Sequence, residues 1–304
     1  MKYHRPTKSH KRIWLLLLLF VFVSAFLIKC IVQIRQSLFF SHKERINVLI
    51  YGQTPKVVSI GVADGQHYVV TFPADYVTQT PGCYGNYRIG ALGKLSYLEK
   101  KPEILQRTFS HMLGSYIDYY YYPKKGIDSV YYGSSEEGAL SLTIANILSY
   151  HTNASLIDSV YVTVKVMGLT PRMFKKLELI THEKSGKREI DTEAMARAYQ
   201  GYFFENAYRK ERASVQILYR YRYETALSLS QVLQGEGIRV VDMSITEPDL
   251  STCMLRTKKS TQSKTVMDLS QMLGCSVESG NTDIYDIILI LGDKERTWEI
   301  CENP

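Results

Sequence analysis

One acidic side chain directly after a predicted buried strand is the first candidate for chemistry in this sequence. The stretch VVTFPADYV, residues 69–77, predicts a strand that ends in a proline and is followed by an exposed acid, Asp75. Such a carboxylate can be the surviving part of a phosphate-handling site, or it can be an ordinary turn residue. A reacting diphosphate needs several cationic groups around it, because negative charge concentrates on its oxygens. The role of Asp75 therefore depends on which charged groups surround it.

Arg88, on a glycine-rich loop, is the one cation that the sequence places to assist Asp75. A single arginine on a loop is usually only a solvated surface charge. The seven histidines show no metal-ligand spacing, and the chain has neither a phosphate-binding glycine loop nor a Gly-x-Ser-x-Gly motif. The sequence therefore predicts no metal site and no cofactor site, and it leaves Asp75 and Arg88 as weak catalytic candidates.

The cysteines decide which redox chemistry the chain can carry. They stand at Cys30, Cys83, Cys253, Cys275 and Cys301. None forms a Cys-x-x-Cys pair, so neither a zinc site nor a thioredoxin-type site is predicted. Two of the last three could form a disulfide in an oxidising compartment, or all could be small buried hydrophobic side chains. The sequence leaves the pairing open.

The positive charge of the chain is concentrated at its N-terminus. The formal net charge is +7, and residues 1–12 contain five bases and no acid. Removing these five from the 37 lysines and arginines leaves 32 bases against 30 acids, so the remainder is nearly neutral. This distribution argues against nucleic acid as a partner.

A long apolar run, IWLLLLLFVFVSAFLI, follows this basic tail over residues 13–28. A helix needs roughly 20 residues to cross the hydrocarbon core of a bilayer. The run reaches that length by continuing through KCIVQI to residue 34, with Lys29 extending its amine toward the headgroups. We predict a single-pass transmembrane signal anchor over residues 13–34, with residues 1–12 cytoplasmic and the body extracytoplasmic. The membrane lipid is then a partner of this helix.

Two other fates of this segment are weaker predictions. Val23-Ser24-Ala25 resembles a signal-peptidase site, but the residues after it stay strongly apolar. A lipid-attachment motif ending at Cys30 is disfavoured by Lys29, because that position calls for a small residue.

The first part of the body predicts a sheet. Three runs rich in β-branched and aromatic residues, 46–52, 57–63 and 67–72, read as strands, and Asp64-Gly65 predicts a tight turn between the last two. An irregular glycine-containing loop follows, and then a helix over 95–113 with a break at Pro102. The run 116–123 reads as a strand; its consecutive tyrosines could stack on sugars or bases, but in a strand they alternate between faces.

The middle of the chain predicts mostly helices. Helical spacing is found over 135–150, from Pro171 to about residue 180, and over 191–211, which begins at Asp191. Residues 159–166, SVYVTVKV, alternate like a strand, and residues 182–189 read as a polar loop.

The last part predicts a compact β-α-β-β-α-β unit over about 213–294, followed by a tail over 295–304. The expected strands are 214–218, 238–243, 253–257 and 285–292, and the expected helices are about 224–234 and 264–273, both closed by glycine. The fold class is therefore α/β, of the α+β type, with two units after the anchor.

The last unit resembles the LytR C-terminal domain of exported, cell-envelope proteins, found mostly in bacteria with Gram-positive-type walls. The final stretch YDIILILGDK is the most specific part of that resemblance. The opening strand departs from the pattern, since Tyr219-Arg220 follows it where the family commonly has Asn-Gly.

The front of the body, through INVLIYG, VVTFPADYV and GCYGNYRIGAL, resembles the catalytic domain of the LytR-CpsA-Psr (LCP) family. That family transfers phosphate-linked wall polymers from polyprenyl carriers, with magnesium held by aspartates and with arginines gripping the pyrophosphate. The resemblance places the metal-binding aspartate at Thr54 and the arginine of the strand-end motif at Ala74, so only Asp75 remains. An Arg-x-Arg pair occurs at Arg220 and Arg222, but it lies in the C-terminal unit.

The sequence thus predicts a degenerate LCP-like α/β domain over 46–210 and a LytR C-terminal-like domain over 213–294. We expect a cell-envelope protein that binds or scaffolds wall polymers or envelope proteins without turning over substrate. The alternative is an LCP-type phosphotransferase, with magnesium, whose site has been rebuilt around Asp75 and Arg88. An intracellular transcription attenuator is a third interpretation, and the predicted anchor argues against it.

Overall fold

The computed structural model describes residues 14, 17–24, 37, 43–124, 149–184, 186–246, 251–258 and 263–301. The chain divides into two compact units, one of residues 1–42 and 154–162 and the other of residues 43–153 and 163–304. In the smaller unit, residues 17–24 are helical and their apolar side chains are exposed. Within the described residues, no helix combines the length and apolarity that a bilayer crossing requires. The anchor over residues 13–34 lies mostly outside these residues and stays a prediction.

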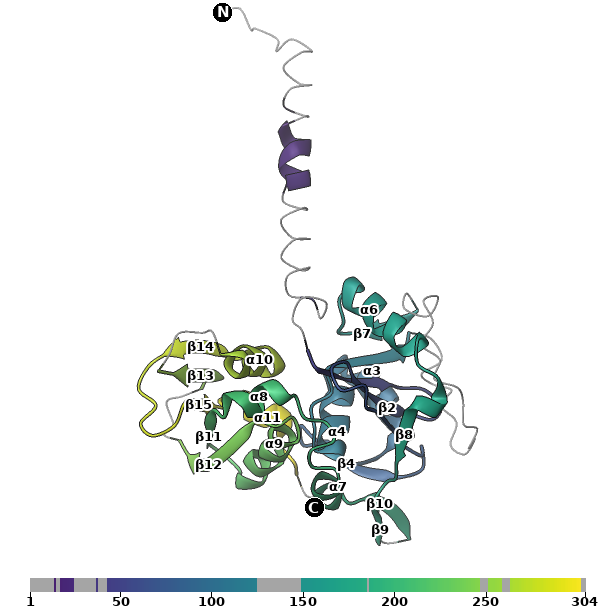
Figure 1. Ribbon diagram of the computed structural model, residues 1–304. Coiled ribbons are helices and arrows are strands. Elements are labelled where there is room, and N and C mark those ends of the chain that lie inside the picture. Colours follow the sequence, from purple (N-terminus) through teal and green to yellow (C-terminus); the bar gives the residue numbers. More distant parts are fainter. Residues whose placement is uncertain are drawn as a thin grey trace, which may run out of the picture. The chain divides into compact units, whose positions relative to one another are not determined.

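The larger unit is a mixed α/β structure built on three sheets (Figure 1). The first sheet has the strand order β7-β6-β1-β2-β3-β8. Its strands are β1 (Arg45–Ile50), β2 (Lys56–Gly61), β3 (His67–Thr71), β6 (Tyr119–Pro123), β7 (Tyr150–Thr152) and β8 (Phe174–Leu177). The three strands expected first in the sequence are confirmed, and Gly65 of the predicted turn has a φ of 66°. Glycine adopts that left-handed backbone without strain.

The strand directions in this sheet follow from its register. β2 is antiparallel to β1 and β3, so β1 and β3 run the same way. β6 is parallel to β1, and β8 is parallel to β3. β7, at the edge of the sheet, is antiparallel to its neighbour β6.

A second sheet of four strands occupies two stretches that the sequence predicted as loops. Its order is β5-β4-β10-β9, made from β4 (Val77–Thr80), β5 (Gly85–Arg88), β9 (Thr181–Lys184) and β10 (Lys187–Ile190). The predicted polar loop 182–189 is therefore a hairpin. Its strands carry mainly charged side chains, and only β10 buries two residues, which explains why the apolar periodicity did not reveal it.

Helices α3 (Leu92–Glu99) and α4 (Glu103–Leu113) confirm the predicted helical stretch and its break at Pro102. Gly114 ends α4 with a φ of 64°. Their apolar faces join the sheets in one core. Its largest fully buried side chains include Tyr51, Phe72, Phe109, Phe203, Leu49, Leu92, Ile89, Ile104 and Leu105.

The predicted strand over residues 159–166 is wrong, because these residues lie in helix α6 (Leu156–Met167). The alternating valines fit a helix as well as a strand. Val162 and Val166 lie four residues apart and are buried, whereas Val160 and Val164 form an exposed row on another face. A short repeat of β-branched residues does not distinguish the two structures.

Two predicted helices are shorter than expected. Pro171 begins only a 3₁₀ turn, η3 (Pro171–Met173), before β8 pairs with β3. The helix expected over 191–211 is split into α7 (Thr192–Ala198), which Asp191 caps, and α8 (Asn206–Glu211). Gly201, with a φ of 95°, lies in the interruption. The helix expected over 135–150 falls almost entirely outside the described residues.

The third sheet contains the predicted C-terminal strands and one more. Its order is β12-β11-β15-β13-β14, from β11 (Ser214–Tyr219), β12 (Arg239–Ile245), β13 (Met254–Thr257), β14 (Ser276–Ser279) and β15 (Ile287–Ile290). The sequence missed the edge strand β14, whose residues are mostly polar and exposed. Helices α9 (Tyr223–Gly235) and α10 (Lys264–Leu273) are as predicted, and a short helix α11 (Lys294–Trp298) follows β15.

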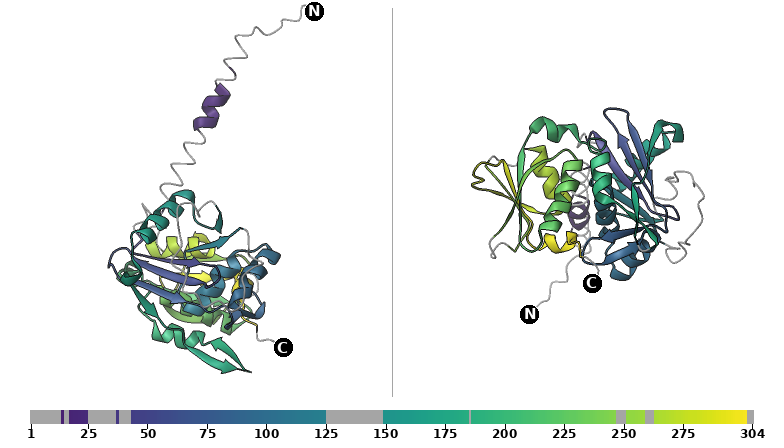
Figure 2. Two further views of the ribbon diagram at one scale, coloured as in Figure 1. Left: turned by 90° about the vertical axis from the view of Figure 1, so that its right-hand side faces the viewer. Right: turned by 90° about the horizontal axis from the view of Figure 1, so that it is seen from below.

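A second core lies against the third sheet and its helices. Tyr116 and Tyr208, from the part of the chain before residue 213, are buried in this core. Helices α4 and α9 contact each other, and Figures 1 and 2 show them between the first and third sheets. His111 of α4 joins this contact through a hydrogen-bond distance of 2.8 Å between its Nδ1 and the hydroxyl of Ser228 on α9.

Candidate functional site

The corner after β3 is held between two neighbouring loops. Phe72 N donates to Pro55 O over 2.8 Å, which brings the end of β3 beside the β1–β2 loop containing Thr54. On the other side, Gly90 N donates to Ala74 O over 2.9 Å. A Cβ at position 90 would lie 3.0 Å from the Ala74 Cβ, a tight contact, so a glycine suits this close approach. The backbone framework around residues 73–75 is thus well defined.

Tyr51 fills the space beneath this corner. Its ring is buried, and its hydroxyl lies 2.9 Å from Ile89 O and 3.1 Å from Gly90 O. The same hydroxyl accepts a hydrogen bond of 2.8 Å from Gly93 N. A Cβ at Gly93 would lie 2.6 Å from the Tyr51 ring, which shows how closely the loop packs. The volume next to the end of β1 is therefore occupied by an aromatic side chain.

Two arginines from different strands flank the corner. Asp75 is exposed on the turn before β4, and Arg88 is exposed at the end of β5, where it pairs in register with Val77. Arg188 comes from β10, on the other side of β4, and its Nη1 donates to the Tyr76 hydroxyl over 2.9 Å. That hydrogen bond raises the pKa of Arg188, and the negative charge of Asp75 raises it further.

The sequence did not identify Arg188 as part of this corner. It is 112 positions from Tyr76 and lies in a stretch that was predicted to be a polar loop. Only the parallel pairing of β10 with β4 reveals its place. The fold thus brings Asp75, Arg88 and Arg188 to the exposed surface around residues 75–77. A second carboxylate, Glu189 of β10, lies in register with Val77 but is buried.

The residues at this corner do not fit the magnesium ion that the family resemblance implies. Magnesium is held through oxygen ligands, usually one or two carboxylates together with substrate oxygens. The β1–β2 loop does lie beside the end of β3, but it presents Thr54 where the resemblance calls for an aspartate. Ala74 stands where the resemblance calls for an arginine. Asp75, exposed on a turn, is left as the only carboxylate of the motif, and neither the second acid nor the arginine of the motif stands beside it.

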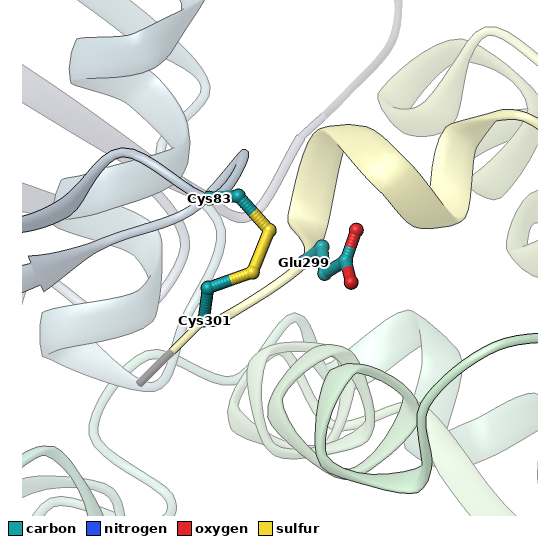
Figure 3. Close-up of side chains that lie close together, drawn as sticks. All are labelled: Cys83, Glu299 and Cys301. Atoms are coloured by element: carbon teal, nitrogen blue, oxygen red, sulfur yellow. A yellow bond between two sulfur atoms is a disulfide. The ribbon is translucent and has the colours of Figure 1, made fainter. Parts of the chain in front are cut away.

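Among the described residues, one group of side chains has metal-ligand proximity: Cys83, Glu299 and Cys301, whose ligand atoms lie within 4.8 Å of one another. Cys83 and Cys301 form a disulfide, with the Glu299 carboxylate beside it (Figure 3). Disulfide sulfurs are not thiolates and do not provide the ligands of a metal site. Glu299 also pairs with Arg222, whose Nε lies 3.3 Å from its carboxylate. The proximity of these three side chains therefore reflects the Cys83–Cys301 disulfide and does not indicate a metal site.

The structure contains two disulfides, and they show the cysteine pairing that the sequence left open. Cys83–Cys301 joins residues 218 positions apart, and next to it Gly82 N and Cys83 N both donate to Glu299 O. The second, Cys253–Cys275, joins the residue before β13 to the residue before β14, at a Cα separation of 4.8 Å. The first bond fastens the C-terminal segment to the β4–β5 hairpin, and the second closes a loop within the third sheet.

A buried polar cluster lies where the two cores meet. Glu236, 1% exposed, directly follows α9 and accepts hydrogen bonds of 3.0 Å from Asn47 Nδ2 and from Tyr116 N. The Ser115 hydroxyl also donates to Glu236. Burial raises the pKa of Glu236 to about 8, even though the positive charge of Lys43 opposes that shift.

Lys43 supplies the positive charge of this cluster. Its amine forms an ion pair with Asp118, whose other oxygen accepts from Asn47 N over 2.8 Å. Burial lowers the pKa of Lys43, but the charges of Asp118 and Glu236 outweigh that effect, and the net pKa lies above its usual value. A cation surrounded by acids in this way stays charged when buried.

Glu205, also fully buried, satisfies the backbone at the start of β1. Its carboxylate accepts from Glu44 N at 3.0 Å and from Arg45 N at 3.2 Å, and its own N donates to Glu236 O. Burial raises the pKa of Glu205. Because Glu205 and Glu236 are 0% and 1% exposed, a substrate in solution cannot reach them. The cluster therefore has a structural role, fixing the third sheet and its helices against the first sheet.

A pocket of about 330 Å³ opens beside α10. Its lining consists of Glu211, Ala213, Thr257, Lys258, Ser263, Val266, Asp286 and Ile287. The Glu211 carboxylate accepts from the amides of Lys264 and Thr265 and from the hydroxyls of Ser263 and Thr265. These bonds cap the N-terminus of α10 and lower the pKa of Glu211 against the opposing effect of burial. Asp286, the other acid of the lining, accepts from the amide and the hydroxyl of Ser214, so both acids of this pocket already make structural hydrogen bonds.

Comparison with known proteins gives loose structural similarity only. A transcriptional regulator from Enterococcus faecalis is 12% identical, and the match covers 52% of this chain and 85% of that one at a TM-score of 0.35. For TagT of B. subtilis the identity is 12%, the coverage 51% and 88%, and the TM-score 0.35. The LytR-CPS2A-psr family protein YwtF (TagT), solved with bound octaprenyl pyrophosphate lipid, is 12% identical, with coverage of 52% and 88% and a TM-score of 0.33.

No family model matches the chain, and no curated protein matches it either. Among these solved structures, YwtF (TagT) is described as a LytR-CPS2A-psr family protein. A likeness at this level carries no argument about activity, which has to be judged from the residues of the chain itself.

Proposed function

We propose that this chain is an extracytoplasmic cell-envelope protein, anchored by residues 13–34, that binds or scaffolds wall polymers or envelope proteins without catalysing phosphoryl transfer. The proposal includes an LCP-like first domain over residues 46–210 and a LytR C-terminal-like domain over 213–294. Its partners are then the membrane lipid around the anchor and the polymers or proteins of the envelope, with no nucleic acid.

The composition of the corner at residues 73–75 is the observation that carries the non-catalytic part of this proposal. The two loops that would hold a metal ion and a diphosphate do lie side by side, but they present Thr54 and Ala74 there. The Tyr51 ring fills the space beneath them. A pocket without paired carboxylates and without bidentate arginines cannot neutralise a transferring diphosphate.

The two disulfides support the extracytoplasmic part. Disulfides persist in oxidising compartments and are rare where cellular thiols are kept reduced. Both bonds here involve residues after the predicted anchor. The basic tail before that anchor predicts the same orientation, with the body outside.

A phosphotransferase with a rebuilt site is the second candidate, and Arg188 is the observation that favours it. Arg188 and Arg88 come from two different strands to the neighbourhood of Asp75. With this function, the two guanidinium groups would hold the phosphates and Asp75 would hold the metal ion or take up the proton of the acceptor. The exposure of all three side chains argues against it, because charges in contact with bulk water stabilise a transition state weakly.

Turnover by the full-length chain in detergent or lipid discs distinguishes the two functions. The chain is incubated with a polyprenyl-pyrophosphate-linked glycan, wall acceptor and magnesium, and released polyprenyl phosphate is measured. We expect no release above the protein-free background, and the same result from Asp75→Ala and Arg188→Ala. Release by the wild-type chain that disappears in these two variants, but persists in an exposed control such as Glu224→Gln, would establish the phosphotransferase.

A further inference from the structure

Helix α6 carries a row of large apolar side chains on an exposed face. The row consists of Leu156, Val160, Val164 and Met167, which are 71%, 48%, 55% and 57% exposed. Spacings of three and four residues place these side chains on one side of the helix. The other side of the helix faces the protein interior, since Val162 and Val166 are buried. An exposed apolar row of this length needs a partner, because isolated apolar residues are common on surfaces but contiguous stripes are not.

The chain around this row is basic. Residues 156–177 contain four exposed bases, Lys165, Arg172, Lys175 and Lys176, and a single acid, Asp158, which is buried. Met173, 55% exposed, adds another apolar side chain beside Arg172. An apolar helix face flanked by lysines and arginines is typical of helices that lie in the interface of an anionic bilayer.

Helix α6 lies in the connection between β7 and β8, and the first sheet fixes where this connection begins and ends. β7 runs antiparallel to β1 and β6, toward the end of the sheet at which β1 begins. Asn153 follows β7 and hydrogen bonds to Tyr120 N and Asp118 O, at the start of β6. On the far edge of the sheet, β8 starts in register with His67 and, through β2, with Ile46 of β1. The connection containing α6 thus leaves the sheet and returns to it at the end where β1 begins.

The end of the sheet at which β1 begins follows the predicted membrane anchor closely in the sequence. The anchor ends at about residue 34 and β1 begins at Arg45, which leaves ten residues between them. A fully extended chain of that length reaches at most about 35 Å. The start of β1 therefore stays within about 35 Å of the end of the anchor, and the connection that contains α6 leaves and rejoins the sheet at this same end.

We propose that the exposed row of α6 inserts into the headgroup and upper acyl region of an anionic bilayer, the same bilayer that the N-terminal segment spans. The inference rests on the anchor in the proposed function. Insertion to a depth of roughly 5–10 Å would bury the row, while the flanking bases contact lipid phosphates. The body is then held in one orientation against the membrane instead of swinging on its ten-residue link.

Tryptophan quenching by brominated lipids tests this contact in the full-length chain. The chain has two tryptophans, Trp14 in the anchor and Trp298, which is buried. The test variant is Val160→Trp in a Trp14→Phe background, reconstituted in vesicles of phosphatidylcholine and phosphatidylglycerol brominated at shallow acyl positions. Its matched control is Leu98→Trp in the same background. Leu98 is 64% exposed on α3, a helix whose first turn is bound to the opposite end of the sheet through Tyr51.

We expect the fluorescence of the tryptophan introduced on α6 to fall by about twofold in brominated vesicles. The tryptophan of the α3 control should keep its fluorescence. Removing phosphatidylglycerol should weaken the quenching of the α6 variant, because the flanking bases then lose their anionic partners. The wild-type chain, through Trp14, reports separately on insertion of the anchor.

The outcomes separate this inference from the anchor on which it rests. Quenching of Trp14 in the wild-type chain without quenching of the α6 variant would overturn this inference and leave the anchor standing. Absence of quenching in both chains would reject both. A tryptophan on α6 that is shielded from aqueous acrylamide but not quenched by lipid would show that protein covers the row, which also overturns the inference.

Discussion

Asp75 and Glu236 are two carboxylates with opposite surroundings. Asp75 stands exposed at a strand end between arginines from β5 and β10, whereas Glu236 is enclosed among Asn47, Ser115 and Tyr116. Burial raises the pKa of Glu236, and solvent cannot reach this acid. A perturbed pKa marks a functional site only when a substrate has access to the group, so Glu236 belongs to the architecture of the molecule.

Because the pKa of Glu236 is raised in the folded chain, the free energy of unfolding should depend on pH. Its pKa is about 8 in the folded chain against 4.5 for an ordinary glutamate, because burial penalises the charged form. Between these values the folded state binds more protons than the unfolded state, so the free energy of unfolding contributed by this group falls as pH rises. Lys43, Asp118 and Glu205 are the charged neighbours that share the cluster.

Glu236→Gln removes this titration and keeps the acceptor oxygen. We expect the Tm of Glu236→Gln relative to wild type to increase as the pH is raised from about 5 to about 8. Thermal unfolding followed by circular dichroism across that range measures the difference. Glu224→Gln, at an exposed residue on α9, the helix that Glu236 follows, should match the wild-type curve at every pH. A constant difference between Glu236→Gln and wild type would show that Glu236 is ionised throughout.

At the scale of elements, the sequence predicted what depends on local periodicity and turn chemistry. Strands β1 to β3 were found from their β-branched runs and from Asp64-Gly65, and α9 and α10 from apolar spacing closed by glycine. Helix α6 was misread because its valines satisfy both periods. The second sheet was missed because β4, β5, β9 and β10 are only four residues long, and because the pairing of β4 with β10 joins residues far apart in the chain.

The candidate site was predictable only in part for the same reason. Asp75 and Arg88 lie thirteen positions apart and could be connected through one hairpin. Arg188 reaches them through a parallel pairing with β4, and no local pattern specifies such a pairing. The buried cluster at the junction was equally hidden, because Glu205 and Glu236 look like surface acids in the sequence.

The contact between α4 and α9 depends on a glycine. A Cβ on Gly235 would lie 1.7 Å from Gly114 O, which is backbone and has little freedom to move away. Gly235→Ala should therefore separate the two helices and lower the free energy of unfolding by about 1–3 kcal/mol or more. Chemical denaturation measures this loss. Gly52→Ala, where nothing lies within 4 Å, is the matched control and should leave stability unchanged or slightly higher. Equal behaviour of the two variants would contradict the close helix contact.

At the scale of the whole molecule, the chain joins its N-terminal and C-terminal parts in two ways. One is the buried polar cluster with the α4–α9 contact, and the other is the Cys83–Cys301 disulfide near the C-terminus. In the chain-entropy description, a crosslink across 218 residues stabilises by about 5 kcal/mol, against about 3 kcal/mol for one across 22 residues. The long-range bond is thus the stronger constraint on the unfolded chain.

These disulfides provide a test of orientation in the membrane. In intact cells that express the chain, a membrane-impermeant maleimide should label it strongly only after an impermeant reductant has opened the disulfides. A variant with serine at Cys83, Cys253, Cys275 and Cys301 should lose this reduction-dependent labelling, which is read as a mass shift on a gel. Labelling that requires lysis of the cells would place the body inside and support the intracellular interpretation.

Direct binding of a diphosphate is the sharpest test of the proposed function, because it examines the corner without requiring turnover. Geranyl pyrophosphate is titrated into the full-length chain in lipid discs, with and without magnesium, and binding is followed by ³¹P NMR and calorimetry. We predict no saturable, magnesium-dependent binding, and identical titrations for wild type, Asp75→Ala and Arg188→Ala. Saturable binding that needs magnesium and is lost in both variants would contradict the proposal that this corner does not hold a diphosphate.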